Sequence, residues 1–241
     1  MIFKPMKKIF FVVLLLLSMP CLTDEPQDAL NRIESEWASI YYGMPKQQQG
    51  AAYARLLDKT LTLSRQYPQD TGALFWHAVV KASYADHQDP VSALAAIYDV
   101  RDLLTKVITI NPNTMGGSAY VALGTLYYRV PAWPIAFGDN KEAEKLFQTA
   151  LKISPNGIDS NYFYAEFLLA THQLKEAEIH FERAGAAPVR PEQTYADTQL
   201  KNEAKLALKI IRDKKADAAG NSFLSLLNIA QIDSRFETFA I

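Results

Sequence analysis

The chain has 241 residues, of which 49% are hydrophobic and 21% charged, and this composition excludes a disordered chain. Its 25 basic and 26 acidic residues give a net charge of −1, which offers no electrostatic footprint for nucleic acid. The single cysteine, Cys21, excludes a disulfide framework and a thiolate zinc site.

The first 23 residues have the three parts of a secretory signal peptide. Lys4, Lys7 and Lys8 precede the apolar run 9–17, and small or turn residues follow. This run is too short to cross a bilayer, for which a helix needs about 20 residues. We expect cleavage near Thr23 and a periplasmic protein with 22 basic and 26 acidic residues. An uncleaved membrane anchor is the alternative.

Cys21 raises the further alternative of a membrane-anchored lipoprotein. A bacterial lipid-attachment site has a small residue just before the cysteine, whereas Pro20 stands there in this chain. Proline constrains the backbone where the processing enzymes must bind. A soluble exported protein is therefore the simpler interpretation, and membrane contact is expected only if Cys21 is lipidated or the leader is retained.

The rest of the chain is predicted to be a series of helices separated by prolines. Helices are expected over residues 26–42 and 48–67, and a degenerate helix pair over 70–112. Prolines recur at separations of 44, 43 and 33 residues, and each follows one apolar-periodic helix and precedes another. These are Pro68, Pro112, Pro155 and Pro188.

The segment 158–191 matches the tetratricopeptide (TPR) pattern, a 34-residue pair of antiparallel helices. Ala165 and Ala177 occupy the small positions at which the two helices approach each other. The preceding unit has Gly124 and Ala143 at such positions but carries an insertion from Arg129 to Asp139. Two prolines in this insertion argue against helix there, so we expect a loop.

We therefore predict an all-α fold, a tetratricopeptide-like helical repeat solenoid over residues 24–212 with a long loop inserted in one repeat. A final helix over 191–212 would cap the open end of the array. Residues 213–241 would form a C-terminal extension, with a short apolar helix over 223–229. No window shows sustained period-two alternation, so no sheet is expected.

Motifs for catalysis are missing from the sequence. It has no nucleophile elbow, phosphate-binding loop, dinucleotide-binding turn or H-E-x-x-H pair. The four histidines are better explained as solvated or helix-packed side chains than as metal ligands. We therefore expect a protein that is not an enzyme and that uses no cofactor and no metal.

The expected binding site combines the concave face with the inserted loop. In a TPR array the first helix of each repeat lines the concave face, which would suit a ligand with an apolar body and polar ends. The alternative is that Arg129 simply pairs with Asp159 or Glu166. Aromatic residues on the loop are not required to pack in the hydrophobic core and are free to bind a partner. The candidate ligand- or partner-binding residues are Tyr128, Arg129, Trp133, Phe137, Asp139, Asp159, Tyr162 and Glu166.

These residues carry a resemblance to a known family. The P-x-W-P-x-x-F-G-D run over residues 131–139, placed between TPR helices and followed by D-x-N-Y over 159–162, resembles the T-component family of tripartite ATP-independent periplasmic (TRAP) transporters. The resemblance covers residues 70–190. It implies a TPR-like periplasmic protein that associates with the transporter's solute-binding protein, and family members are typically lipid-anchored.

Two functions follow as hypotheses. The first is a periplasmic binding module that docks a TRAP solute-binding protein and shelters a small, partly hydrophobic organic solute. The second is an envelope scaffold that acts through protein–protein contacts alone and has no ligand cavity. A homo-oligomer is compatible with either function.

Overall fold

The computed structural model of the chain describes residues 26–220, with side chains described through residue 213. The predicted leader over 1–23, Cys21 and the predicted apolar helix over 223–229 lie outside these residues. Between residues 26 and 220 the structure is built of helices and has no strand, apart from a single bridge between Ala132 and Gly138. The predicted all-α helical-repeat fold is confirmed.

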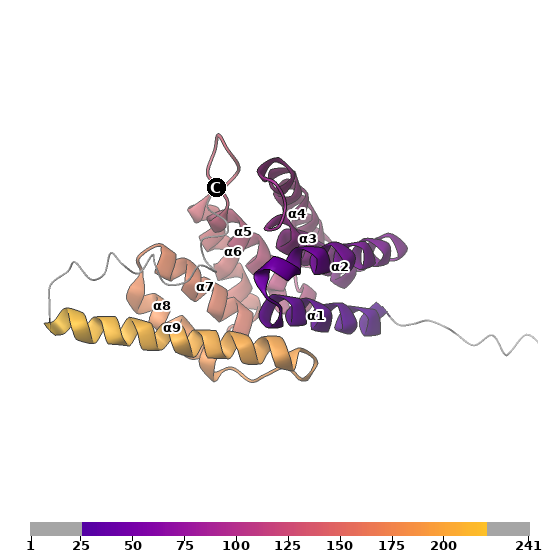
Figure 1. The fold of residues 1–241 in the computed structure, drawn as a ribbon. Helices are drawn as coiled ribbons and strands as arrows, with labels where there is room; N and C mark the ends of the chain where they lie inside the picture. Colours follow the sequence, from indigo (N-terminus) through magenta and orange to yellow (C-terminus); the bar gives the residue numbers. More distant parts are fainter. Residues whose placement is uncertain (1–25, 221–241) are drawn as a thin grey trace, which may run out of the picture.

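The helices follow one another as hairpins (Figure 1). Helices α5 and α9 are each preceded by a short 3-10 helix, and α9 packs against α8 at the end of the array. The helices are α1 (Pro26–Gly43), α2 (Lys46–Gln66), α3 (Thr71–Ala85), α4 (Pro90–Ile110), α5 (Ser118–Arg129), α6 (Asn140–Ile153), α7 (Ile158–Ala170), α8 (Leu174–Ala186) and α9 (Thr194–Gly220), with the 3-10 helices η2 (Thr114–Gly117) and η3 (Pro191–Gln193).

Small residues let the paired helices approach closely. Ala143, Ala165 and Ala177 are fully buried between neighbouring helices. A Cβ atom added to Gly124 would lie 3.2 Å from the Phe147 ring and 3.3 Å from the carbonyl oxygen of Ala143. Helices α5 and α6 therefore touch at Gly124, where a larger side chain would force them apart.

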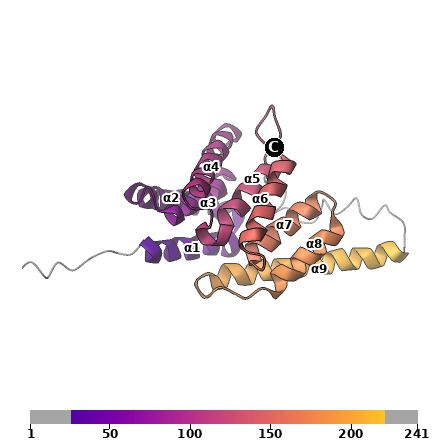
Figure 2. The same ribbon diagram turned by 180° about the vertical axis from the view of Figure 1, so that it is seen from behind.

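The array curves until its first and last helices meet. Both views show the start of α9 beside α1 and the rest of α9 running along α7 and α8 (Figures 1 and 2). Tyr42 of α1 and Tyr195 of α9 are in edge contact, with their ring centroids 6.1 Å apart. The concave face is therefore closed into a hollow, and α1, α3, α5, α7 and the segment around η3 line a cavity in it.

The last helix differs from the prediction. It begins at Thr194 and continues to Gly220, so it crosses the boundary expected at residue 212. Residues 213–219 consist of aspartate, lysine and alanine, and neither glycine nor proline is present there to end the helix.

Candidate binding site on the concave face

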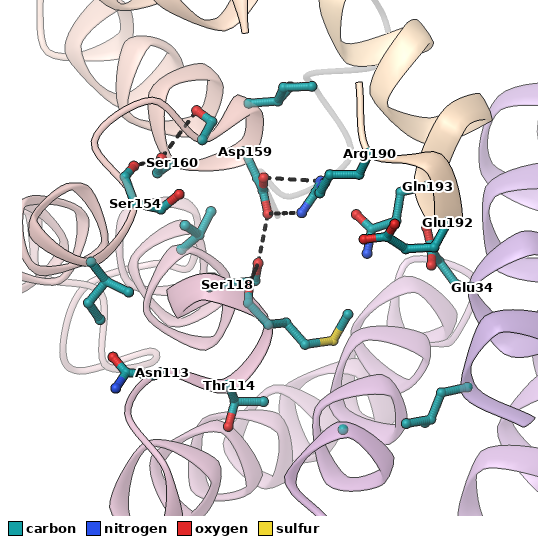
Figure 3. A pocket seen from close by; sticks show the side chains of 18 of the residues that line it. Glu34, Asn113, Thr114, Ser118, Ser154, Asp159, Ser160, Arg190, Glu192 and Gln193 are labelled. Carbon is teal, nitrogen blue, oxygen red and sulfur yellow. Dashed lines mark hydrogen bonds and ion pairs between the residues drawn. The ribbon is translucent and has the colours of Figure 1, made fainter. Parts of the chain in front are cut away.

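A cavity of about 820 Å³ opens on the concave face, at the end where α3, α5 and α7 begin. Helix α1 and the segment around η3 close its opposite side (Figure 3). Leu30, Trp76, Val121 and Ile158 contribute apolar surface to its wall. The volume lies within the range of about 300–1,000 Å³ that is usual for small-molecule sites.

A chain of polar contacts crosses the cavity (Figure 3). The Ser118 hydroxyl at the start of α5 donates a hydrogen bond of 2.7 Å to Asp159 in the first turn of α7. The guanidinium of Arg190 lies 3.1 Å from the Asp159 carboxylate and 2.6 Å from that of Asp197. Because Asp197 is fully buried and also accepts the backbone N–H of Arg190 at 2.8 Å, these contacts fix the segment before α9.

Glu34 of α1 also lines the cavity and is only 4% exposed. Burial raises the pKa of its carboxyl from the usual 4.5 to about 7, and the attraction of Arg190 only partly opposes this. The nearby carboxylates of Asp197 and Glu192 raise the pKa further, while the Gln193 amide lowers it slightly. Glu34 therefore takes up its proton at a higher pH than an ordinary glutamate does.

A second polar group, which we call the inner network, lies deeper on the same faces of α5 and α7. Its members are Arg129, Tyr162, Glu166 and Glu203. Arg129 pairs with Glu166 at 3.2 Å, and the Tyr162 hydroxyl lies 3.1 Å from Glu166 and 3.0 Å from Glu203. Arg129 also donates a hydrogen bond of 2.9 Å to the Tyr128 hydroxyl. The network thus ties three helices together, α5, α7 and α9.

The Tyr162 hydroxyl lies within hydrogen-bond distance of two carboxyl groups, those of Glu166 and Glu203, and a phenol has one proton to donate to them. Burial raises the pKa of Glu166, and Arg129 and Tyr162 oppose this rise. For Arg129 burial lowers the pKa, but the Glu166 carboxylate and Tyr128 more than offset it and the guanidinium stays charged.

Tyr41 of α1 lies within electrostatic range of this network. Its surface is 49% exposed, yet desolvation by the surrounding protein raises the pKa of its phenol to about 12, and Glu166 and Glu203 add to the rise. Asp86, at the end of α3, has its pKa raised to about 7 by desolvation, against the attraction of Lys46 and Arg129. Two further titratable groups, one on α1 and one at the end of α3, are thus desolvated within range of the network's charges.

Several predicted site residues do meet on this face. Asp159 lines the cavity, and Arg129, Tyr162 and Glu166 form the inner network beside Tyr128. Of the two partners considered for Arg129, the structure has Glu166, while Asp159 pairs with Arg190.

The inserted loop separates the remaining predicted residues. Trp133 is 85% exposed at the loop that projects beyond α5 and α6 (Figures 1 and 2). Phe137 does not share this exposure, because its ring packs 5.0 Å from that of Tyr98 and 5.3 Å from that of Tyr127. Asp139 accepts hydrogen bonds from the backbone N–H groups of Lys141 and Glu142 and so caps α6. Phe137 and Asp139 thus anchor the loop.

Glu34, Arg190, Glu203 and Tyr41 were not predicted as site residues. They lie on α1, on α9 or just before it. Because the array closes on itself, Glu34 and Arg190 line the cavity and Glu203 meets Tyr162 of α7. The register of a single TPR repeat contains no signal for this closure.

Within residues 26–220, no group of three or more histidine, cysteine, aspartate or glutamate side chains is arranged to hold a metal ion. His77 bonds to Thr60 and His180 to Asn161, as expected for helix-packed imidazoles. None of the described helices is long and apolar enough to cross a membrane.

Comparison with known proteins gives one family match. Residues 135–196, which span α6, α7, α8 and the start of α9, match the tetratricopeptide repeat family. No curated protein matches the chain. TPR proteins are generally non-enzymatic scaffolds whose repeats mediate protein–protein contacts through extended concave surfaces. The repeat match and the helical hairpins together make this chain a TPR-like helical-repeat protein.

Proposed function

We propose that this protein is a periplasmic TPR-type binding module of a TRAP transporter. In this proposal the cavity shelters a small organic ligand, and the loop over residues 131–138 docks the solute-binding protein. The observation that carries the proposal is the cavity of about 820 Å³, which has both apolar walls and polar groups from several helices. A scaffold that acts through outer surfaces alone needs no such hollow.

The loop has the properties of a docking element. Its base is closed by a hydrogen bond of 2.9 Å from Gly138 N–H to the Pro131 carbonyl. Only glycine fits there, because a Cβ atom at Gly138 would lie 2.1 Å from the Val130 carbonyl oxygen. This base holds Trp133 and Ile135 in solvent at 85% and 61% exposure. Exposed aromatic anchors on a preorganised loop are typical binding hot spots.

The docking function can be tested with one variant and one control. The solute-binding protein of a TRAP transporter from the same organism is immobilised, and its affinity for this protein is measured by biolayer interferometry. We expect Trp133→Ala to weaken binding by roughly tenfold or more, which is about 1.4 kcal/mol. Leu206→Ala, at a side chain 58% exposed on α9, should leave the affinity unchanged. Equal binding by wild type and Trp133→Ala would remove the loop from the proposal.

The envelope scaffold is the second candidate, because the exposed loop would serve it equally well. It differs in predicting that the hollow carries no ligand. Native mass spectrometry of protein isolated from periplasmic extract separates the two functions. An added mass that is lost on denaturation supports the binding module, whereas bare protein in every preparation supports the scaffold.

A further inference from the structure

The charges that line the cavity are unbalanced. The lining contains the carboxylates of Glu34, Asp70, Asp159 and Glu192 but a single cation, Arg190. Arg190 is already engaged by Asp159 and by Asp197, which lies just behind the wall. The starts of α3, α5 and α7 add about half a positive charge each, which is still less than the excess of negative charge.

Glu34 is the group that this imbalance affects most. It is 4% exposed, it lines the cavity, and no lysine or arginine among the described residues forms an ion pair with it. Arg190 acts on it only from a distance, and the Gln193 amide is a neutral neighbour. A carboxylate removed from water without a cation destabilises a fold, and native proteins keep such groups chiefly at functional sites.

We propose that the cavity binds the ammonium or guanidinium group of a ligand, which pairs with the Glu34 carboxylate beside Glu192. This inference rests on the proposed function and names the class of its ligand. The cation would replace water and complete the charge balance of the wall, while Leu30, Trp76 and Val121 would cover the apolar body of the ligand. The same chemistry can come from a free organic amine or from a basic side chain of a bound peptide.

An anionic ligand fits this site poorly. It would meet three carboxylates from α1, α7 and the α8–α9 segment, namely Glu34, Asp159 and Glu192, and Arg190 is already shared between two aspartates. Repulsion between these carboxylates and the negative charge of the ligand would weaken binding. The cavity therefore discriminates by the sign of the ligand's charge.

The test uses three probes that share a phenyl body and differ in the head group: phenethylamine, phenylpropanol and phenylpropanoate. Isothermal titration calorimetry of the full chain is carried out near pH 8, where an alkyl ammonium with a pKa of about 10 stays charged and Glu34 is ionised. We expect phenethylamine to bind roughly tenfold more tightly than phenylpropanol, and phenylpropanoate to bind more weakly than either.

Isosteric variants of the acidic residues test where the cation of the ligand binds. Glu34→Gln should weaken phenethylamine binding by roughly tenfold and leave phenylpropanol binding unchanged. Glu36→Gln is the matched control, because Glu36 lies on the same helix but pairs with Lys59 outside the cavity at 2.7 Å. Should Glu34→Gln fail to fold, Glu192→Gln at an exposed position of the cavity rim supplies a second, smaller decrease.

Each outcome bears on the inference. Binding of the peptide acetyl-Ala-Lys-Ala-amide more tightly than phenethylamine supports a peptide side chain as the source of the cation, and weaker peptide binding supports a free amine. Phenylpropanoate or phenylpropanol binding as tightly as the amine would overturn the inference but keep the cavity as a ligand site. An unchanged amine affinity in Glu34→Gln would also overturn it. If no probe binds, both the inference and a ligand function of the cavity are contradicted.

Discussion

Buried charged groups form ion pairs at one end of the hollow, whereas at the other end a buried carboxyl group lacks one within residues 26–220. In the inner network, Arg129 faces Glu166 at 3.2 Å, and Tyr162 bridges Glu166 and Glu203. At the cavity, Glu34 is equally well buried but forms no ion pair with a described residue. The buried groups of the inner network pair with one another and so hold helices together. Glu34 has no such cation in the part of the fold that the structure describes, and its carboxylate is available to a ligand.

The largest expected effect comes from breaking the inner network. Arg129→Met leaves Glu166, which is 8% exposed, without its cation, and should cost about 3–5 kcal/mol of the free energy of unfolding. Urea denaturation followed by circular dichroism measures this loss. Adding Glu166→Met to the same chain should recover most of it, because the uncompensated charge is then gone. A single variant as stable as wild type would show that the network does not hold α5 to α7.

Replacing Glu34 at the cavity should raise the free energy of unfolding, and by less than Arg129→Met lowers it. The folded-state pKa of Glu34 is raised from 4.5 to about 7, so its contribution to stability is fully present below about pH 4.5 and is lost as the pH rises through 7. At about pH 8 we expect Glu34→Gln to be more stable than wild type by about 2–3 kcal/mol, and at about pH 4 to be equal to it.

The difference between wild type and Glu34→Gln isolates this group from others that titrate in the same range, such as Asp86. Urea denaturation at several pH values gives the two stability curves. Glu36→Gln should run parallel to wild type throughout, since its carboxylate lies outside the hollow. If the curves of wild type and Glu34→Gln are parallel, Glu34 is not the desolvated acid that the structure indicates.

The smallest effect on stability is expected for a residue of the loop, outside both ends of the hollow. Trp133 is 85% exposed on the loop and belongs to neither the network nor the cavity. Trp133→Ala should therefore change the free energy of unfolding by less than about 0.5 kcal/mol, as measured by urea denaturation. A loss of several kcal/mol would show that the indole packs as core.

The sequence predicts one end of the hollow better than the other. Ala165, Ala177 and the prolines between helices report local spacing, so the hairpins and the inward faces of α5 and α7 could be predicted. That register places Arg129 near both Asp159 and Glu166, and the choice of Glu166 as its partner comes from the structure. The cavity also needs Glu34 of α1 to meet the segment around Arg190. This contact depends on the summed curvature of the whole array, which no local pattern encodes.

The loop shows a second limit of prediction. Trp133 and Phe137 are aromatic residues four positions apart on the same insertion, and composition cannot distinguish them. The fold distinguishes them because the loop base turns Phe137 toward Tyr98 and Tyr127 and leaves Trp133 in solvent. The contact of Phe137 with Tyr98 of α4 therefore decides that Phe137 anchors the loop while Trp133 is exposed.

The three tryptophans of the chain allow the most direct test of the concave cavity as the ligand site. Trp76 lines the cavity, Trp37 lies beside it with the ring centroids 5.8 Å apart, and Trp133 stands on the distant loop. The measurement is the set of indole N–H signals in a nitrogen–proton correlation spectrum during titration with phenethylamine. We predict that the Trp76 signal moves with saturation while the Trp133 signal stays in place. A shift of Trp133 with Trp76 unmoved would contradict the account.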